Sequence, residues 1–482
     1  MRAPMRQSSG HAPHPSRTQW RRPARKMEKP MSITSDRLMR LILGDWRIFR
    51  KSHDELKEKQ LDDLETVGNF LLSRRGEASG TVLAQRLLDN FESATAQSQL
   101  DFFLKLAERF GADQERLQQA IKAYQDHPCD ETVHKLHLAA EPRRQELIRR
   151  LNYSSGGTYR LIKMRERLHA SMAEHPQLTA VDTDFAHLFT SWFNPGFLEM
   201  KPMNWHTPAS ILEKLIKYEA VHTIHDWADL RNRLDPVDRY CFGFFHPQLV
   251  DEPLIFVEVA LSKDIPGSIQ QLLDGERTPT PPDEATTAVF YSISNTQKGL
   301  SGVPFGSFLL KHVIDYLKKE IPSLTTYVTL SPAPGFAKWL TRERAAEKSA
   351  FIAPDQREAL RILDLAGWQH DEQKVEVVRD VLLECARAYF LLAKTSRGTP
   401  QDPVSRFHLR NGAELHRIHF MGDTSANGMR QAFGLMVNYL YVPDDIEKNH
   451  EAFVERGEIV ASDVVKAGVS KTPAKKGKRG RR

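Results

Sequence analysis

The sequence predicts an α+β protein with more than one domain, in which an all-α helical bundle is followed by an α/β domain. Three observations support this prediction. The chain has 482 residues, which exceeds what one hydrophobic core normally contains. Apolar residues recur every three or four positions from Ser35 to about Leu234, as they do in amphipathic helices. Beyond that point, short β-branched and aromatic segments alternate with helical ones.

The N-terminal half contains several segments with helical spacing, separated by polar, glycine-containing or proline-containing breaks. These segments are LMRLILGDWRIF (38–49), DLETVGNFLL (63–72), TVLAQRLLDNF (81–91), LDFFLKLAERF (100–110) and ERLQQAIKAY (115–124). One further continuous helix is predicted over 209–234, because Thr207-Pro208 offers a capping residue followed by proline at the first helical position. The apolar stripes of the helices predict either burial within the chain or self-association.

The C-terminal half begins with segments that are typical of strands. The predicted strands are 239–247, 254–261, 287–294, 325–330, 407–420 and 433–442. Helices are predicted over 301–320 and over about 355–395. A strand, a helix and another strand therefore follow one another between residues 287 and 330, which is the pattern of an α/β unit.

The basic residues are concentrated at the two ends of the chain. Residues 1–32 carry eight Lys or Arg and one acid, residues 471–482 carry seven and no acid, and residues 33–470 have a formal net charge of −8. We expect disordered basic tails over 1–34 and 469–482, and no specific nucleic-acid binding. The first tail has the composition of a transit peptide, or the natural start is Met27 or Met31. We expect a cytoplasmic protein, or a mitochondrial-matrix protein if the tail is a transit peptide.

The composition excludes several classes of protein. No run of about eighteen apolar residues is present, so we expect no membrane span. Cys129, Cys241 and Cys385 are too far apart for a zinc motif or a disulfide framework, which favours a reducing compartment. The pairs His222/His225 and His416/His419 lack further ligands at metal spacing. We expect these histidines to be structural and not to bind a metal.

The glycine-containing loop after the 287–294 strand is the most informative motif. A helix is predicted to begin near Val303, directly after this loop, and the unpaired N–H groups of a helix start can bind phosphate. The motif is neither a Walker loop nor a dinucleotide fingerprint. The candidate binding residues are Gln297, Lys298, Gly299, Leu300, Ser301 and Gly302. Taken alone, the loop is also explained as a β-α turn that uses glycine for closure.

The loop resembles the pyrophosphate loop of the N-acetyltransferase (GNAT) superfold, in which a strand, a [Q/R]-x-x-G-x-[G/A] loop and a helix receive coenzyme A. In this chain the spacing between Gln297 and Gly299 is one residue shorter than usual.

More segments resemble the malonyl-CoA decarboxylase family. They are EAVHTIHDWADLRNRL (219–234), EPLIFVEVALSKDIPGSIQ (252–270), YSISNTQKGLSGVPFGSFLLK (291–311), LSPAPGFAKWL (330–340), DPVSRFHLRNGAELHRIHFMGD (402–423) and GLMVNYLY (434–441). The resemblance covers about residues 60–460. It implies a helical oligomerisation domain over 35–190 and an acetyltransferase-like catalytic domain over 191–468. It also implies conversion of malonyl-CoA to acetyl-CoA and CO2 without a metal or an organic cofactor, in a homo-oligomer for which we expect a tetramer.

The resemblance also implies catalytic residues: Ser294, His408 and Tyr441. Loss of CO2 leaves an enolate, so the site needs donors for the thioester oxygen and a proton source for C2. We expect Ser294 to orient the carboxylate and His408 to protonate C2, because the ordinary histidine pKa lies near neutrality. The alternative is that His408 deprotonates Ser294 for proton transfer. Without the resemblance, Ser294 could serve loop amides, His408 could be an exposed strand residue, and Tyr441 could belong to the core.

Two other functions share parts of this pattern. A CoA-dependent acyltransferase would use the same loop but would need an acceptor groove and usually a base. A helical assembly protein with a degenerate acetyltransferase-like domain would bind CoA without turnover. Product analysis with and without amines separates the first of these from a decarboxylase, and CoA binding without turnover identifies the second.

Overall fold

The computed structural model describes residues 63–73, 77–303 and 309–467. Both predicted tails, over 1–34 and 469–482, lie outside the described residues. The predicted helical segment 38–49 also lies outside them, and the predicted helix start near Val303 runs into residues 304–308, which are not described.

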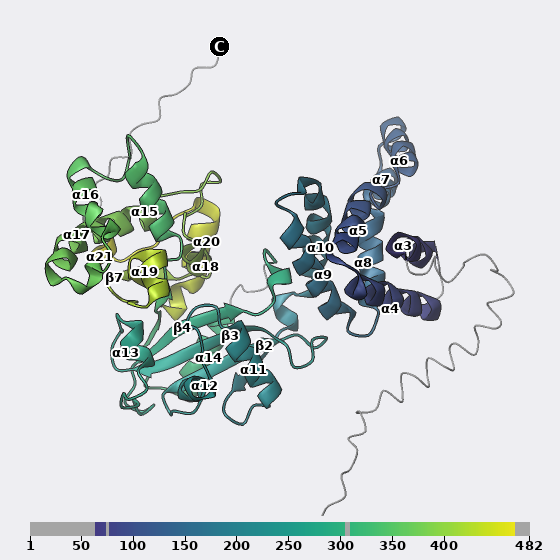
Figure 1. The fold of residues 1–482 in the computed structure, drawn as a ribbon. Coiled ribbons are helices and arrows are strands. Elements are labelled where there is room, and N and C mark those ends of the chain that lie inside the picture. The colour runs from purple at the N-terminus through teal and green to yellow at the C-terminus, as the bar shows by residue number, and fades with distance from the viewer. Residues whose placement is uncertain (1–62, 74–76, 304–308, 468–482) are drawn as a thin grey trace, which may run out of the picture. The chain divides into compact units, whose positions relative to one another are not determined.

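The N-terminal region is helical, which confirms the predicted helices between residues 63 and 124 (Figure 1). Side chains cap several of these helices: Thr95 accepts the N–H of Ser98, and Asp113 accepts the N–H of Arg116. The elements are α3 (Leu64–Ser73), α4 (Glu77–Ser93), α5 (Ala96–Arg109), α6 (Gln114–Asp126), α7 (Asp130–Ala140), α8 (Arg143–Asn152), α9 (Gly157–Ser171), η2 (Pro176–Leu178), α10 (Thr179–Trp192) and η3 (Pro195–Phe197).

The continuous helix predicted over 209–234 is wrong. The chain forms α11 (Ala209–Tyr218) and α12 (Trp227–Leu234), with a break between them. The break is stabilised by side-chain bonds to the backbone, because the Glu219 carboxylate accepts the N–H groups of Val221 and His222 at 2.8 Å each. Asp226 then caps α12. His222 and His225 therefore lie in the break and not on one helix face.

The C-terminal region contains an eight-stranded sheet in the order β1-β2-β3-β4-β5-β8-β6, with β7 paired to β8. Neighbouring strands are antiparallel except for β4 and β5, which are parallel. The strands are β1 (Glu199–Met203), β2 (Arg239–Phe245), β3 (Pro253–Ser262), β4 (Thr287–Asn295), β5 (Thr326–Thr329), β6 (Ser331–Pro332), β7 (Glu414–His419) and β8 (Met436–Tyr441). Five of the six predicted strands are confirmed.

The strand predicted over 407–420 is wrong in its first part. Residues Pro403–Arg410 form helix α18, and β7 begins only at Glu414. The helix starts because Asp402 accepts the N–H of Ser405 and Pro403 occupies the first turn. His408 therefore lies on a helix. The signal was present in the sequence as Asp-Pro before an apolar periodic segment.

Strands β4 and β5 separate along their length. Their pairing runs from Thr287 opposite Thr326 to Phe290 opposite Thr329. Strand β4 continues to Asn295 paired only with β3, whereas the chain after β5 forms β6 and pairs with β8. A parallel strand pair that opens in this way leaves backbone and side chains at the point of separation available to a ligand. This is the arrangement of strand, loop, helix and strand that the acetyltransferase resemblance implies.

The remaining helices lie between and after the strands along the chain. They are α13 (Ile269–Leu273), η4 (Lys298–Leu300), α14 (Leu309–Glu320), α15 (Phe336–Ala345), α16 (Pro354–Ala359), η5 (Leu360–Asp364), η6 (Trp368–His370), α17 (Glu372–Leu391), α19 (Ala426–Ala432), η7 (Pro443–Asp445), α20 (Ile446–Arg456) and α21 (Asp463–Lys466). One hydrophobic cluster includes Ile162 and Phe189 of the helical region together with Leu254 and Leu300 of the sheet region. The two regions therefore share a core.

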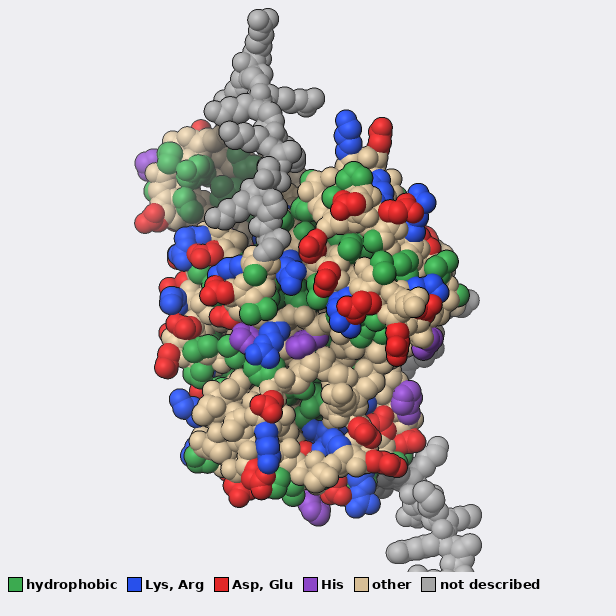
Figure 2. Space-filling model, turned by 90° about the vertical axis from the view of Figure 1, so that its left-hand side faces the viewer, with side chains coloured by type: hydrophobic (Ala, Val, Ile, Leu, Met, Phe, Trp, Pro, Cys, Tyr) green, Lys and Arg blue, Asp and Glu red, His purple; other side chains and the backbone are tan. Residues whose placement is uncertain are grey.

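The surface carries charges of both signs. On the face shown in Figure 2, Lys and Arg side chains are interspersed with Asp and Glu side chains and form no single basic patch. This distribution agrees with the acidic balance of residues 33–470.

Candidate active site

A cavity of about 410 Å³ lies where β4 and β5 separate. Six parts of the chain contribute to its wall: the break between α11 and α12, β3, the end of β4, the loop after it, β6 and helix α18. The wall includes Ile293, Asn295, Leu300, Ser301, Gly302, Val303, Ser331, Pro332, Phe407 and His408. Part of the predicted phosphate loop and the predicted catalytic histidine therefore face one cavity, although they are more than a hundred positions apart in the sequence.

His408 is held by a hydroxyl at each ring nitrogen. Its Nε2 lies 3.1 Å from Ser331 Oγ, and its Nδ1 lies 2.8 Å from Tyr441 Oη. Ser331 donates its own proton to Thr329 Oγ1 at 2.9 Å, so it accepts from His408. We therefore assign the proton of the neutral ring to Nε2, with Tyr441 donating to Nδ1. The imidazole also stacks on the Tyr439 ring at 4.5 Å between centroids.

Burial keeps His408 neutral in the unliganded protein. The side chain is 2% exposed, and burial lowers its pKa to about 3. The expectation that this histidine is near its ordinary pKa is therefore wrong. At neutral pH the ring supplies a neutral N–H donor and not an imidazolium, and any proton that it gives up must be replaced through Nδ1.

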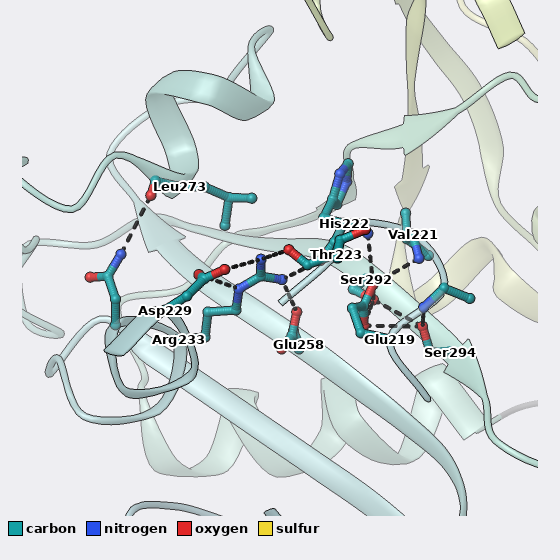
Figure 3. A network of polar contacts seen from close by, with 12 residues as sticks. Glu219, Val221, His222, Thr223, Asp229, Arg233, Glu258, Leu273, Ser292 and Ser294 are labelled. Carbon is teal, nitrogen blue, oxygen red and sulfur yellow. Dashed lines mark hydrogen bonds and ion pairs between the residues drawn. The ribbon is translucent and has the colours of Figure 1, made fainter. Parts of the chain in front are cut away.

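Ser294 lies in β4 and is not among the residues that line the cavity; its hydroxyl bonds to the segment between α11 and α12, as Figure 3 shows. Its Oγ donates to Glu219 Oε2 at 3.1 Å and accepts the N–H of Ala220 at 3.2 Å. Ser292 on the same strand face also bonds to Glu219, at 2.7 and 2.8 Å to the two oxygens. One carboxylate in the break between α11 and α12 therefore positions both serines.

A fully buried acid lies next to this cluster (Figure 3). Glu258 on β3 is opposite Ser292 on β4 and is fully buried. Its Oε2 accepts from Arg233 Nη1 at 3.3 Å, and Arg233 also bonds to Asp229 and to the carbonyl groups of His222 and Thr223. Burial, reinforced by the nearby charge of Glu219, raises the pKa of Glu258 to about 8.

The six loop residues that were predicted to bind phosphate differ in their positions. Leu300, Ser301 and Gly302 line the cavity, and Lys298 is exposed. Gln297 is buried and its amide lies 3.4 Å from Glu252. Gly299 packs directly on the Ile162 carbonyl of α9, where a Cβ atom would overlap with backbone.

The structure thus brings His408 together with Tyr441, and it places Ser294 with Glu219. The side chains of His408 and Ser294 form hydrogen bonds with different partners. Sequence reasoning missed Glu219 and Ser331. Glu219 was assigned to a continuous helix, and the Asp226 N-cap was the signal that could have revealed the break. For Ser331 the sequence carries no comparable signal.

Two further observations concern metal-ligand groups and membrane-spanning helices. Across the described ranges 63–73, 77–303 and 309–467, no group of three or more His, Cys, Asp or Glu side chains is placed to hold a metal ion. In the same part of the chain, none of the helices combines the length and apolar character needed to cross a bilayer.

Family models match most of the chain. The model of the malonyl-CoA decarboxylase N-terminal domain matches residues 110–193, and that of the C-terminal domain matches residues 196–479. Among curated proteins, the mitochondrial malonyl-CoA decarboxylase of Anser anser anser is 35% identical over 382 residues, which are 74% of each chain. That of Mus musculus is 32% identical over 405 residues, which are 77% of this chain and 82% of the mouse protein.

Solved structures of malonyl-CoA decarboxylases are also similar to this chain. The crystal structure of malonyl-CoA decarboxylase from Rhodopseudomonas palustris is 57% identical, with a TM-score of 0.82 over 84% of this chain and 99% of that one. The corresponding structure from Agrobacterium vitis is 52% identical, with a TM-score of 0.80 over the same shares. The similarity therefore includes the helical region as well as the sheet.

Proposed function

The chain belongs to the malonyl-CoA decarboxylase family and is a carboxy-lyase that acts on malonyl-CoA, and we propose how its residues remove the carboxyl group. The observation that carries the proposal is the shared cavity, which is lined by the loop residues Leu300 to Gly302 and by His408. In the proposal, loop residues Gln297 to Gly302 bind the diphosphate side of CoA. The malonyl group extends past the end of β4 toward His408.

His408 and Tyr441 protonate the enolate in this proposal. Loss of CO2 places negative charge on the thioester oxygen and C2. In the proposal, the Nε2–H of His408 exchanges its bond to Ser331, another residue of the cavity wall, for the enolate. As Nε2 gives its proton to C2, Tyr441 gives its own to Nδ1, so the ring ends neutral. Burial raises the pKa of Tyr441 well above its ordinary value. The tyrosinate therefore regains a proton, which comes from water and balances the reaction.

Ser294 orients the malonyl carboxylate in the proposal. Its hydroxyl exchanges the bond to Glu219 for a bond to substrate, while Ser292 and the backbone N–H groups of Val221 and His222 keep Glu219 in place. Val221 forms part of the cavity wall, which supports a substrate position near this segment.

The experiment is turnover of malonyl-CoA by the full chain and by two variants. The wild-type protein should release acetyl-CoA and CO2, with the same products whether or not amines are added. Ser294→Ala and His408→Ala should each lower kcat by a factor of about 100 to 10,000, with CoA affinity nearly unchanged. Folded wild-type protein without turnover contradicts the function, and unchanged kcat in both variants contradicts the assigned residues.

We also propose that residues 35–190 form an oligomerisation domain and residues 191–468 the catalytic domain of a tetramer. Exposed apolar side chains on α6 and α7 support an interface on the helical region: Tyr124, Val133 and Leu138. Sedimentation of the intact protein should give the mass of four chains. A monomer at micromolar concentration contradicts this proposal.

We propose that the protein is located in the cytoplasm. The alternative location is the mitochondrial matrix. The three cysteines are free, which agrees with a reducing compartment. The curated goose and mouse relatives are described as mitochondrial. Imaging of tagged chains with and without residues 1–34 decides between them, because import that depends on these residues supports the matrix.

A further inference from the structure

Arg165 of α9 connects the helical region to the loop that follows β4. Its side chain is 2% exposed, and its Nη1 donates to the carbonyl oxygens of Gly299 at 2.9 Å and Ser301 at 3.0 Å. Its Nε donates to Asp182 of α10 at 2.7 Å. A buried guanidinium thus bonds two loop carbonyls while an acid on the neighbouring helix holds it.

The bonds to Arg165 determine the direction in which a loop amide points. In a trans peptide the C=O and the next N–H point in opposite directions. Because the Ser301 carbonyl points to Arg165, the Gly302 N–H points away from it, and Gly302 is in the cavity wall. Gly302 has φ +80°, a conformation that glycine adopts without strain. An amide in this position can donate to an anion in the cavity.

The packing of α9 against the loop supports the same conclusion. Gly299 lies against the Ile162 carbonyl, one helical turn before Arg165 on the same face of α9. Burial opposes the charge on Asp182, but the bonds from Arg165 and His169 outweigh it and lower the Asp182 pKa. The Asp182–Arg165 pair is therefore ionised and holds its geometry over the neutral pH range.

We propose that Arg165 is a positioning residue for coenzyme A: it holds loop 298–303 in the form whose Gly302 N–H receives the diphosphate, while the N–H groups of Leu300, Ser301 and Val303 bond to carbonyl groups of the loop itself. The inference rests on the proposed function, since it takes the loop as the CoA site. It makes α9, which lies outside the sheet region, a functional part of the binding site. Arg165 itself contacts no substrate.

The test compares two substrates that differ in the diphosphate. Malonyl-CoA carries it, whereas S-malonyl-pantetheine has the same thioester without it. For Arg165→Met we expect KM for malonyl-CoA to rise about tenfold or more, because hydrogen bonds to a charged group are lost, with kcat within about threefold. The value of kcat/KM for S-malonyl-pantetheine should match the wild type. Arg165→Lys keeps the positive charge but loses the guanidinium that bonds to both loop carbonyls and to Asp182. It should recover part of the affinity for malonyl-CoA.

Arg144 provides a matched control. It is also a buried arginine of the helical region, paired with Asp184 of α10, and its backbone bond goes to Leu106. Arg144→Met should lower stability without changing the ratio of the two substrates' kcat/KM values. If Arg165→Met does not fold, Gly299→Ala tests the packing of the loop on α9 from the loop side. Its methyl group would push the loop away from Ile162 of the same helix.

The outcomes separate the inference from the function on which it rests. A loss confined to malonyl-CoA in Arg165→Met or Gly299→Ala supports the inference. Equal losses with both thioesters, or an unchanged KM for malonyl-CoA, overturn it. A wild-type protein that turns over neither thioester contradicts the proposed function itself.

Discussion

At the scale of single residues, the environment of His408 changes the chemistry that its identity predicts. An exposed histidine titrates near neutrality, but this one is enclosed by Phe407, Tyr439 and Tyr441. Burial makes the charged ring costly, so its pKa falls to about 3. The ring is held by directed hydrogen bonds, and its contacts with Ser331 and Tyr441 are the basis for placing the proton on Nε2.

The lowered pKa of His408 predicts a contribution to acid unfolding. The unfolded chain protonates this ring below the ordinary histidine pKa of 6.5, whereas the folded protein does so only near 3. Its contribution to stability is therefore present above pH 6.5 and is lost as the pH falls toward 3. His408→Gln should reduce the slope of unfolding free energy against pH in this window, by at most about 1.4 kcal/mol per pH unit. Denaturant titrations from pH 7 to 4 measure it.

An exposed histidine serves as the control for that measurement. His312 lies on the exposed side of α14, and His312→Gln should leave the slope as in the wild type. If the free energy of unfolding changes with pH equally in the wild type and in His408→Gln, His408 titrates alike in the folded and unfolded states, and the prediction is wrong.

At the scale of elements, the break between α11 and α12 supplies residues to the site, because it contains Glu219 and Val221. The eight residues between the two helices, 219–226, bring Glu219 to Ser292 and Ser294 and Val221 to the cavity wall. Apolar periodicity runs across this stretch, but the side-chain bonds of Glu219 and Asp226 to backbone N–H groups compete with the helix.

Because Glu219 in this break bonds to Ser292 and Ser294, we expect it to be needed for turnover more than for substrate binding. Glu219→Gln replaces one acceptor oxygen by a donor group in a site that presents two hydroxyls and two N–H groups. We expect kcat to fall about 10- to 100-fold, the range for lost hydrogen bonds to a charged group, with a small change in KM. Steady-state kinetics of malonyl-CoA decarboxylation measure both parameters.

Two comparisons make the Glu219 prediction specific. Glu213→Gln, at an exposed position of α11, should behave as the wild type. Because Ser294 and Glu219 share a hydrogen bond, the double variant with Ser294→Ala should lose less than the product of the single losses. Multiplicative losses would mean that the two residues act independently.

At the scale of the whole molecule, the helical region and the sheet region share one hydrophobic cluster, and Arg165 joins them through the loop. The two family models meet between residues 193 and 196, but the packing does not divide there. Separation of the regions would expose side chains such as Ile162, Leu254 and Leu300, which are each no more than 3% exposed.

The shared core predicts cooperative unfolding. The intact chain should unfold in one transition, with coincident curves from far-UV circular dichroism and from tryptophan fluorescence. A fragment that begins at residue 196 should be markedly less stable, because the sheet side of the shared core becomes solvent-exposed. Two well-separated transitions in the intact protein would contradict this prediction.

The sequence by itself determined the order of helical and α/β regions, most of the strands, the glycine loop and the family, because these depend on local periodicity and on contiguous motifs. His408 and Tyr441 were found by their motifs, and their direct hydrogen bond agrees with a joint role. Their assigned roles, like that of Ser294, remain predictions for the kinetic tests.

Only the tertiary structure decided how these residues are connected. The separation of β4 from β5, the Glu219 bonds to two serines, the Arg165 bonds to the loop and the neutral state of His408 all depend on contacts between distant segments. No local pattern encodes them, because a pKa depends on the whole surroundings of a group and a hydrogen bond depends on where the fold places both partners.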